Sequence, residues 1–164
     1  MNAEGKVDLS EDVLKTLDIA IASIHIPCFR DERTVENVTA AYENVMENPY
    51  VDIIGHPDDG RFPVDMKRLV SKAKKTGTLL EVNNSSLRPE GFRENTKENC
   101  LRMVKECKEQ GVMIVLGSDS HVDADIAEYP YAEEILRETD FPEELVANVS
   151  LEKLKACIKH GKKL

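Results

Sequence analysis

The clearest candidate for chemistry is a short motif in which a carboxylate and an imidazole follow a run of aliphatic residues. Residues 112–116 are continuously apolar, which is typical of a strand buried on both faces, and Asp119 and His121 come just beyond its end. Alternate residues of an extended segment point to the same side, so we expect both side chains to face one cavity. The alternative is an ordinary polar turn after a core strand.

The same layout recurs earlier in the chain. The apolar run at residues 18–24 is followed by His25, and the run at residues 51–55 is followed by His56. Three of the four histidines therefore stand at or just past the ends of apolar runs, which favours a shared metal site over isolated core histidines. The fourth, His160, lies in a lysine-rich tail and is expected at the surface.

The four apolar runs begin at residues 18, 51, 78 and 112, a spacing of 33, 27 and 34 residues. This is the spacing of βαβ units, in which helices connect parallel strands, and it predicts a single α/β domain. Apolar periodicity, caps and glycine terminators place helices at residues 34–48, 65–76 and 96–110 between the strands. Further helices are expected at residues 10–17, 125–138, 142–148 and 151–159.

Parallel strands all end on one face, so His25, His56, Asn83, Asp119 and His121 are expected to converge there. Imidazoles and carboxylates together suit divalent zinc, manganese or iron. Such cations ionise bound water near neutral pH and polarise a phosphoryl or acyl oxygen. We therefore predict His25, His56, Asp119 and His121 as metal ligands, with Asp119 and His121 also catalytic.

Three arginines in loops on the same face could bind an anionic substrate. Arg30, Arg88 and Arg93 each offer a guanidinium fork that matches the oxygens of a phosphate group. Solvated loop arginines are the structural alternative for each of them.

Composition limits the class of protein. The chain has 164 residues, 41% hydrophobic and 32% charged, and a formal net charge of −9. The negative charge disfavours a nucleic-acid surface, although a bound cation would still permit an anionic substrate. No apolar run approaches the ~20 residues of a membrane span, and no secretory leader is recognisable. We expect a cytoplasmic protein without a nucleic-acid or membrane partner.

The four cysteines do not form a metal-binding or disulfide pattern, because no CxxC pair occurs. Cys100 and Cys107 lie on an apolar helical stripe, and Cys157 follows leucines in the same way. We expect reduced core thiols. Cys28, close to His25, is the one cysteine whose thiol could act as a ligand.

Four motifs in succession resemble the PHP (polymerase and histidinol phosphatase) domain family. They are Ile24-His25, Ile54-Gly55-His56-Pro57-Asp58, Leu80-Glu81-Val82-Asn83-Asn84-Ser85-Ser86 and Gly117-Ser118-Asp119-Ser120-His121. The likeness is strongest to the small bacterial phosphatases of this family and covers nearly the whole chain. It implies a distorted seven-stranded β/α barrel and metal-dependent hydrolysis of a phosphorylated small molecule.

The resemblance also implies residue roles. In that family a trinuclear centre would place His25 and His56 on one metal, Asp119 on a second and His121 on a third. A metal-bridging hydroxide would attack the phosphomonoester. The loop that starts at Asn83 would line the substrate pocket, so Asn83 joins Arg30, Arg88 and Arg93 as a candidate for substrate binding.

One departure from the family pattern is informative. In the family, further metal ligands precede the first motif found here: an opening His-x-His, two more histidines and a bridging glutamate. This chain has no counterpart to that segment, which is roughly 70–90 residues long. We therefore expect residues 1–164 to be one PHP domain that is incomplete at its N-terminus, weakly active or inactive by itself, and self-associating. Two alternatives stay open: an inactive, self-associating fragment, and an amidohydrolase-type enzyme acting on a C–N bond.

Overall fold

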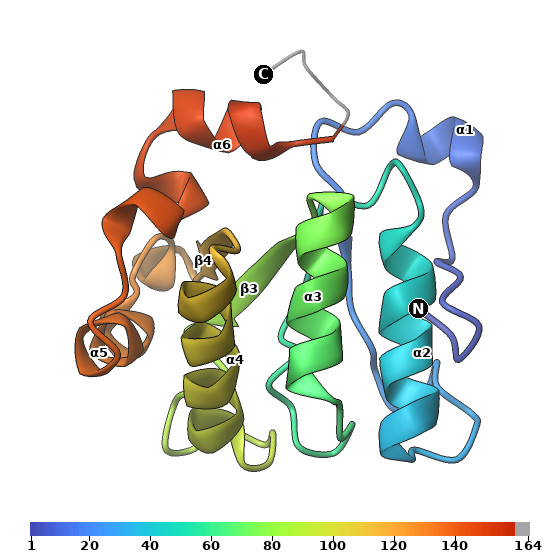
Figure 1. Cartoon of the computed structure of the whole chain (residues 1–164), viewed down its shortest axis with the longest axis horizontal. Helices are drawn as coiled ribbons and strands as arrows, with labels where there is room; N and C mark the ends of the chain where they lie inside the picture. Colours follow the sequence, from blue (N-terminus) through green and yellow to red (C-terminus); the bar gives the residue numbers. More distant parts are fainter. Residues whose placement is uncertain (160–164) are drawn as a thin grey trace.

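The computed structural model describes residues 1–159, which form short parallel strands and longer helices (Figure 1). The prediction for His160 lies outside the described residues. The strands are β1 (Ile21–Ala22), β2 (Ile53–Ile54), β3 (Leu79–Asn83) and β4 (Ile114–Gly117). The helices are α1 (Glu11–Leu14), α2 (Val35–Met46), α3 (Met66–Thr76), α4 (Thr96–Gln110), α5 (Pro130–Glu138) and α6 (Leu151–Cys157). Three 3₁₀ turns are η1 (Asp123–Asp125), η2 (Glu143–Leu145) and η3 (Ala147–Val149).

The four strands form one sheet in the order β1-β2-β3-β4, and every neighbouring pair is parallel. Each of the first three strands is followed by a helix that returns the chain to the next strand. Strands that neighbour one another in chain order, each followed by a helix, are the repeating unit of an α/β barrel. The sheet is therefore consistent with part of such a barrel, while the seven-stranded form stays a prediction.

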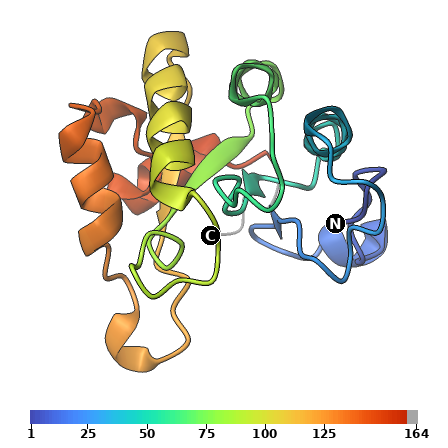
Figure 2. The ribbon, with the colours of Figure 1, turned by 90° about the horizontal axis from the view of Figure 1, so that it is seen from below.

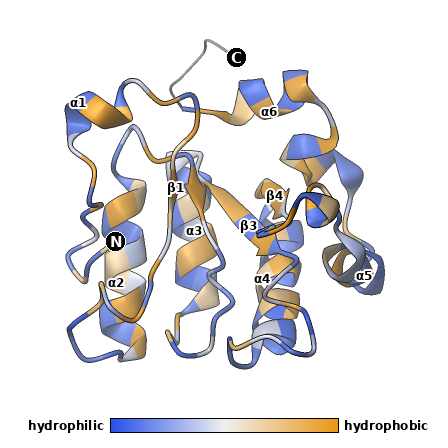
Figure 3. Ribbon diagram, turned by 180° about the vertical axis from the view of Figure 1, so that it is seen from behind, coloured by the Kyte–Doolittle hydropathy of each residue, from blue (hydrophilic) through white to orange (hydrophobic). Residues whose placement is uncertain are grey.

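Helices α2, α3 and α4 lie side by side over one face of the sheet (Figure 1). Figure 2 looks at the molecule from the end where the strands terminate, and the loops that follow β3 and β4 lie at this end. Figure 3 shows the opposite face of the sheet, which these three helices do not cover. The strand ends are therefore surrounded by loops, whereas the middle of the sheet packs on helices.

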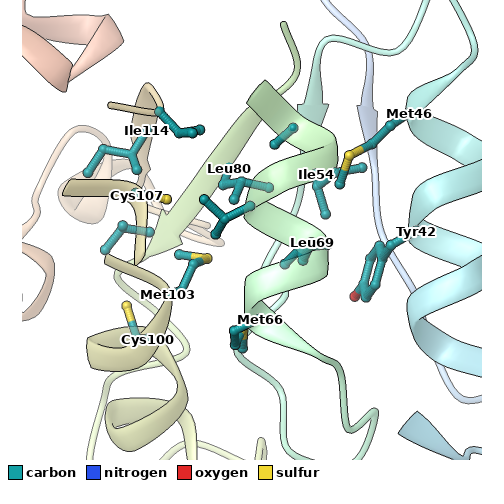
Figure 4. Packing of buried hydrophobic residues seen from close by; sticks show 14 of the residues in the cluster. Tyr42, Met46, Ile54, Met66, Leu69, Leu80, Cys100, Met103, Cys107 and Ile114 are labelled. Atoms are coloured by element: carbon teal, nitrogen blue, oxygen red, sulfur yellow. The ribbon is translucent and has the colours of Figure 1, made fainter. Parts of the chain in front are cut away.

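Alternation along the strands separates the two faces. Leu80 and Val82 belong to the main core, which packs β3 against the helices, and Figure 4 shows Leu80 near Leu69 of α3. Leu79 belongs to a smaller cluster on the other side. Since neighbouring strand residues point to opposite faces, Glu81 shares the side of Leu79. A charged residue is thus directed away from the helical layer.

Helix boundaries agree with the caps read from the sequence. The side chain of Thr34 accepts a hydrogen bond from the backbone of Asn37 at the start of α2, and Asp65 accepts one from Arg68 at the start of α3. Gly77 ends α3 in the left-handed conformation, with φ of 69°. Helix α4 has the predicted bounds. Within residues 1–159, no helix is both long and apolar enough to cross a membrane.

Several expected elements differ from the structure. The helix predicted at residues 10–17 ends at Leu14, and three others differ as follows. Residues 18–20 are not in the strand, because the Asp52 side chain takes the Ala20 backbone N–H in place of a neighbouring carbonyl. The helix predicted from residue 125 begins only at Pro130, whose missing N–H suits the first turn. The helix predicted at residues 142–148 is wrong, since that stretch holds two 3₁₀ turns with extended Val146 between them.

The cysteine prediction is confirmed for the core positions. Cys100 and Cys107 are free thiols and fully buried in the packing of α4. Cys157 is a free thiol that is half-buried, and Cys28 is free and exposed.

Candidate functional site

His25 and His56 stand next to one another beyond β1 and β2. Their ring centroids are 5.0 Å apart and the ring planes are tilted by 57°. His25 is exposed, whereas His56 is 6% exposed. The Nδ1 atom of His56 is buried and has no hydrogen-bond partner among the described residues. A buried polar atom without a partner costs free energy, which makes this nitrogen the first candidate for binding a ligand.

Two predicted site residues have unusual backbone conformations. His56 has a φ of 35° and Asp119 a φ of 49°, both in the left-handed region. For residues other than glycine this conformation costs roughly 1–2 kcal/mol, and it is concentrated at functional sites. At His56 the conformation is supported by Glu81, whose Oε2 accepts a hydrogen bond of 2.7 Å from the His56 backbone N–H.

Glu81 connects β3 to the neighbouring strand ends. Its Oε2 also accepts a hydrogen bond of 3.1 Å from the side-chain amide of Asn83, and the residue is 8% exposed. A Cβ atom on Gly117 would lie 1.9 Å from Glu81 Oε1, so the absence of a side chain at position 117 makes room for the carboxylate. Burial raises the pKa of Glu81, although the hydrogen bonds from Asn83 and His56 oppose this change.

Arg93 ties three predicted site positions together. Its guanidinium donates hydrogen bonds to Ser86 Oγ at 2.7 Å and to Asn83 Oδ1 at 3.3 Å. It also donates one to Asp119 Oδ2 at 3.2 Å, which makes an ion pair. Asn83 Oδ1 accepts a further hydrogen bond from the Ser86 backbone N–H. The Asn83 amide is thus engaged at both ends, which positions Arg93.

The other predicted site residues take no part in the hydrogen bonds of Arg93 among the described residues. His121 is exposed, and its Nδ1 lies 3.0 Å from the backbone carbonyl oxygen of Asp119. Arg30 is exposed in the loop after β1. Arg88 donates a hydrogen bond of 2.6 Å to Asp125 Oδ2, which links the loop after β3 to the loop after β4.

The site keeps its buried imidazole neutral. Burial lowers the pKa of His56 to about 4, and the positive charge of Arg93 acts in the same direction. Burial also lowers the pKa of His25, with smaller contributions from the N-terminal ammonium group and Arg93. A neutral imidazole is the form that binds a metal ion.

The chemistry of His25 and His56 suits a divalent cation, although the pair alone does not complete a metal site. Two adjacent imidazoles, one with a buried unpaired nitrogen, provide nitrogen ligands of the type that zinc and manganese accept. Among residues 1–159, however, no group of three or more His, Cys, Asp and Glu side chains is gathered closely enough to hold a metal ion. A cation at this pair would therefore depend on water or on movement of Asp119 to complete its coordination.

Two buried carboxylates were missed by sequence reasoning. Glu81 had a visible signal, a charge inside the apolar run of β3, which is typical of a residue with a special role. Asp58 is fully buried, and neither of its carboxylate oxygens has a hydrogen-bond partner among the described residues. Burial raises the pKa of Asp58 to about 7. Its signal was its place in the motif with His56, although the sequence could not show that it is buried.

Comparison with known proteins finds similar chains among bacterial proteins named probable phosphatases. One from Clostridium novyi is 47% identical over 161 residues, which is 98% of this chain and 65% of that protein. One from Acetivibrio thermocellus is 42% identical over 158 residues, covering 96% of this chain and 64% of that protein. One from Thermoanaerobacter pseudethanolicus is 40% identical over 163 residues, which is 99% of this chain and 66% of that protein.

The chain thus spans about 65% of the length of the curated relatives it matches. No protein-family model matches the chain, so the likeness to the PHP domain stays a prediction. Identities of this size over nearly the whole chain support a phosphatase family.

Proposed function

We propose that this chain is part of a metal-dependent phosphomonoesterase of the PHP type, acting on a phosphorylated small molecule. The observation that carries the proposal is the pair His25 and His56, with a buried unpaired nitrogen, at the strand ends. The probable phosphatases that resemble the chain support the reaction class. Asp119 and His121 are proposed as the further ligands and catalytic residues.

The residues of the chain would have the following roles. His25 and His56 hold a divalent cation, which when bound polarises the phosphoryl oxygen and lowers the pKa of water. Glu81 holds the backbone of His56 in its left-handed conformation. Arg93, fixed by Asn83 and Ser86, places a positive charge beside Asp119 and so holds that carboxylate in position.

Metal titration tests the first part of the proposal. After removal of metals with a chelator, calorimetric titration with Zn²⁺ or Mn²⁺ should show about one ion per chain. His25→Ala should weaken the affinity of the chain for the metal ion at least about tenfold, because one of the two imidazoles is lost. Hydrolysis of p-nitrophenyl phosphate should require the cation and stop with chelator.

Ile26→Ala is the matched control, since Ile26 is 47% exposed in the same loop and carries no metal-binding atom, and the metal affinity of this variant should equal that of the parent. Affinity that is unchanged by His25→Ala, or hydrolysis that persists in chelator, would contradict the proposal. Metal binding without turnover would instead support the second candidate below.

A self-associating chain without turnover is the second candidate, and the exposed edge at β1 favours it. β1 is an end strand of the sheet, and Ile21 within it is 58% exposed. A cavity of about 540 Å³ runs along this strand, lined by apolar residues that include Leu14, Leu17 and Ile19. An end strand of a sheet, next to a cavity with several apolar lining residues, can pair with another chain. We propose that a second copy covers it in a two-fold dimer.

Light scattering coupled to size-exclusion chromatography should therefore report a dimer at micromolar concentration. Ile21→Lys should shift the mass toward that of a monomer, because a charge would be buried at the interface. Ile126→Lys is the control: Ile126 is 67% exposed in the loop after β4, and its replacement should leave the dimer intact. A monodisperse monomer for the parent chain would contradict self-association.

A further inference from the structure

The loop after β3 encloses a cavity of about 260 Å³ that lies outside the His25–His56 pair. We call it the arginine cavity. Its lining includes Ser85, Ser86, Arg88, Phe92 and Arg93. Two guanidinium groups and two hydroxyl groups therefore border one small space, and Glu90 adds a single negative charge at the same lining.

Both arginines of this cavity keep one buried hydrogen-bond donor unpaired. The Nε atoms of Arg88 and Arg93 are buried and have no partner among residues 1–159. The Arg93 side chain as a whole is only 8% exposed. A buried N–H group without an acceptor costs free energy, so both arginines gain if the loop adjusts to an acceptor from outside the chain. The Arg88 side chain is 40% exposed and can be reached from solvent.

The remaining contacts of the two guanidinium groups hold them in place. Arg93 is fixed by Ser86, Asn83 and Asp119. Arg88 is fixed by Asp125 in the loop after β4. Each arginine thus has a defined orientation before any ligand arrives, which reduces the entropy lost on binding.

The arginine cavity adjoins the strand-end site through Arg93, which lines the cavity and also pairs with Asp119. Phe92 borders the cavity and is 73% exposed; its ring centroid lies 5.3 Å from the Arg93 guanidinium carbon and 5.0 Å from that of Arg61. An oxyanion with several acceptor oxygens suits a cavity lined by two guanidinium groups, since such groups bind phosphate and carboxylate through hydrogen bonds.

We propose that the arginine cavity binds a second anionic group of the substrate, so that the substrate is a phosphomonoester carrying a further phosphate or carboxylate. This inference rests on the proposed function, which places the reacting phosphate at the strand ends. The second group would accept hydrogen bonds from Arg88 and Arg93. It would therefore select substrates with two negative groups.

The first arm of the test measures anion binding without metal. In chelator, inorganic phosphate is titrated into the full chain by calorimetry. The parent should bind phosphate, and Arg88→Gln should weaken that binding at least fivefold. Arg102→Gln is the matched control, because it removes the same charge from an exposed position on α4 and should change the affinity less than twofold. Circular dichroism checks the fold, and Arg88→Lys, which keeps the charge but loses the planar fork, should give an intermediate affinity.

The second arm compares propyl phosphate with propane-1,3-diyl bisphosphate on the Mn²⁺-loaded chain. The bisphosphate should bind at least tenfold more tightly, because its second phosphate reaches the arginine cavity. This advantage should disappear in Arg88→Gln and persist in Arg102→Gln. The affinity for propyl phosphate should be the same in Arg102→Gln as in the parent.

The outcomes separate the two proposals. Absence of phosphate binding in chelator, or binding that Arg88→Gln leaves unchanged, would overturn the arginine cavity as an anion site. Phosphate binding without any advantage for the bisphosphate would overturn its role toward the substrate and point to a free anion. Failure of metal-dependent hydrolysis, with anion binding at Arg88 intact, would count against the proposed function alone.

Discussion

Replacing Asp58 by asparagine should stabilise the metal-free protein strongly at pH 8. Asp58 is fully buried, and its two carboxylate oxygens have no hydrogen-bond partner among the described residues. Above its pKa the folded protein must therefore hold an unpaired charge that water solvates in the unfolded chain. Asparagine has nearly the same shape and no charge. The gain in the free energy of unfolding should be at most about 4 kcal/mol, because the buried asparagine amide also lacks hydrogen-bond partners and its desolvation offsets part of the gain.

The pH dependence follows from the direction of the pKa change. Burial raises the pKa of Asp58 to about 7 in the folded protein, from the usual value of 3.8. The folded state therefore binds the proton more tightly, and its stability falls as pH rises from about 4 to about 7. The difference between Asp58→Asn and the parent should be small near pH 4, grow through this window and be constant above it. Urea denaturation in chelator across this range measures it.

Asp59, the next residue, provides a control of opposite sign. Burial alone would raise its pKa, but the hydrogen bonds from Arg61 bring the pKa below the usual value. Asp59→Asn removes a favourable ion pair and should lower the free energy of unfolding at pH 8. If Asp58→Asn were also destabilising at pH 8, the Asp58 carboxylate would have a partner that the described contacts do not include.

Gly117→Ala should destabilise the protein by about 2–4 kcal/mol, because the new methyl group would overlap Glu81 and leave buried donors unpaired. The added Cβ would lie 1.9 Å from Glu81 Oε1 and 2.8 Å from its Cδ. Glu81 cannot move freely, since its Oε2 accepts hydrogen bonds from the His56 backbone and the Asn83 amide. Moving the carboxylate would break both contacts. Urea denaturation at neutral pH measures the loss.

A double-mutant cycle with Glu81→Ala separates this overlap from other effects of alanine at position 117. In the Glu81→Ala background the carboxylate is gone, so Gly117→Ala should cost less than about 1 kcal/mol. A cost that is the same in both backgrounds would show that the close approach of residues 81 and 117 is not its cause. A parent-like stability of Gly117→Ala would contradict the packing argument directly.

Several elements were predictable because their signals are local. The apolar period, the Asp65 cap and the left-handed Gly77 define α3 within a dozen residues, and the structure agrees. The spacing of the strands likewise predicted parallel neighbours. The stretch at residues 142–148 was not predictable in this way, because extended Val146 forms a parallel bridge with Ile114, and this contact interrupts the expected helix.

Residue types and short spacings were sufficient to predict the α/β class, the alternation of parallel strands with helices and the positions of His25, His56 and Asp119 after strands. The assembly of the site, in contrast, depends on the folded chain. The burial of Glu81 and Asp58, the need for glycine at position 117 and the role of Arg93 depend on contacts between separate strands and loops. Such contacts set the burial, pairing and charge of each group, which no local pattern contains.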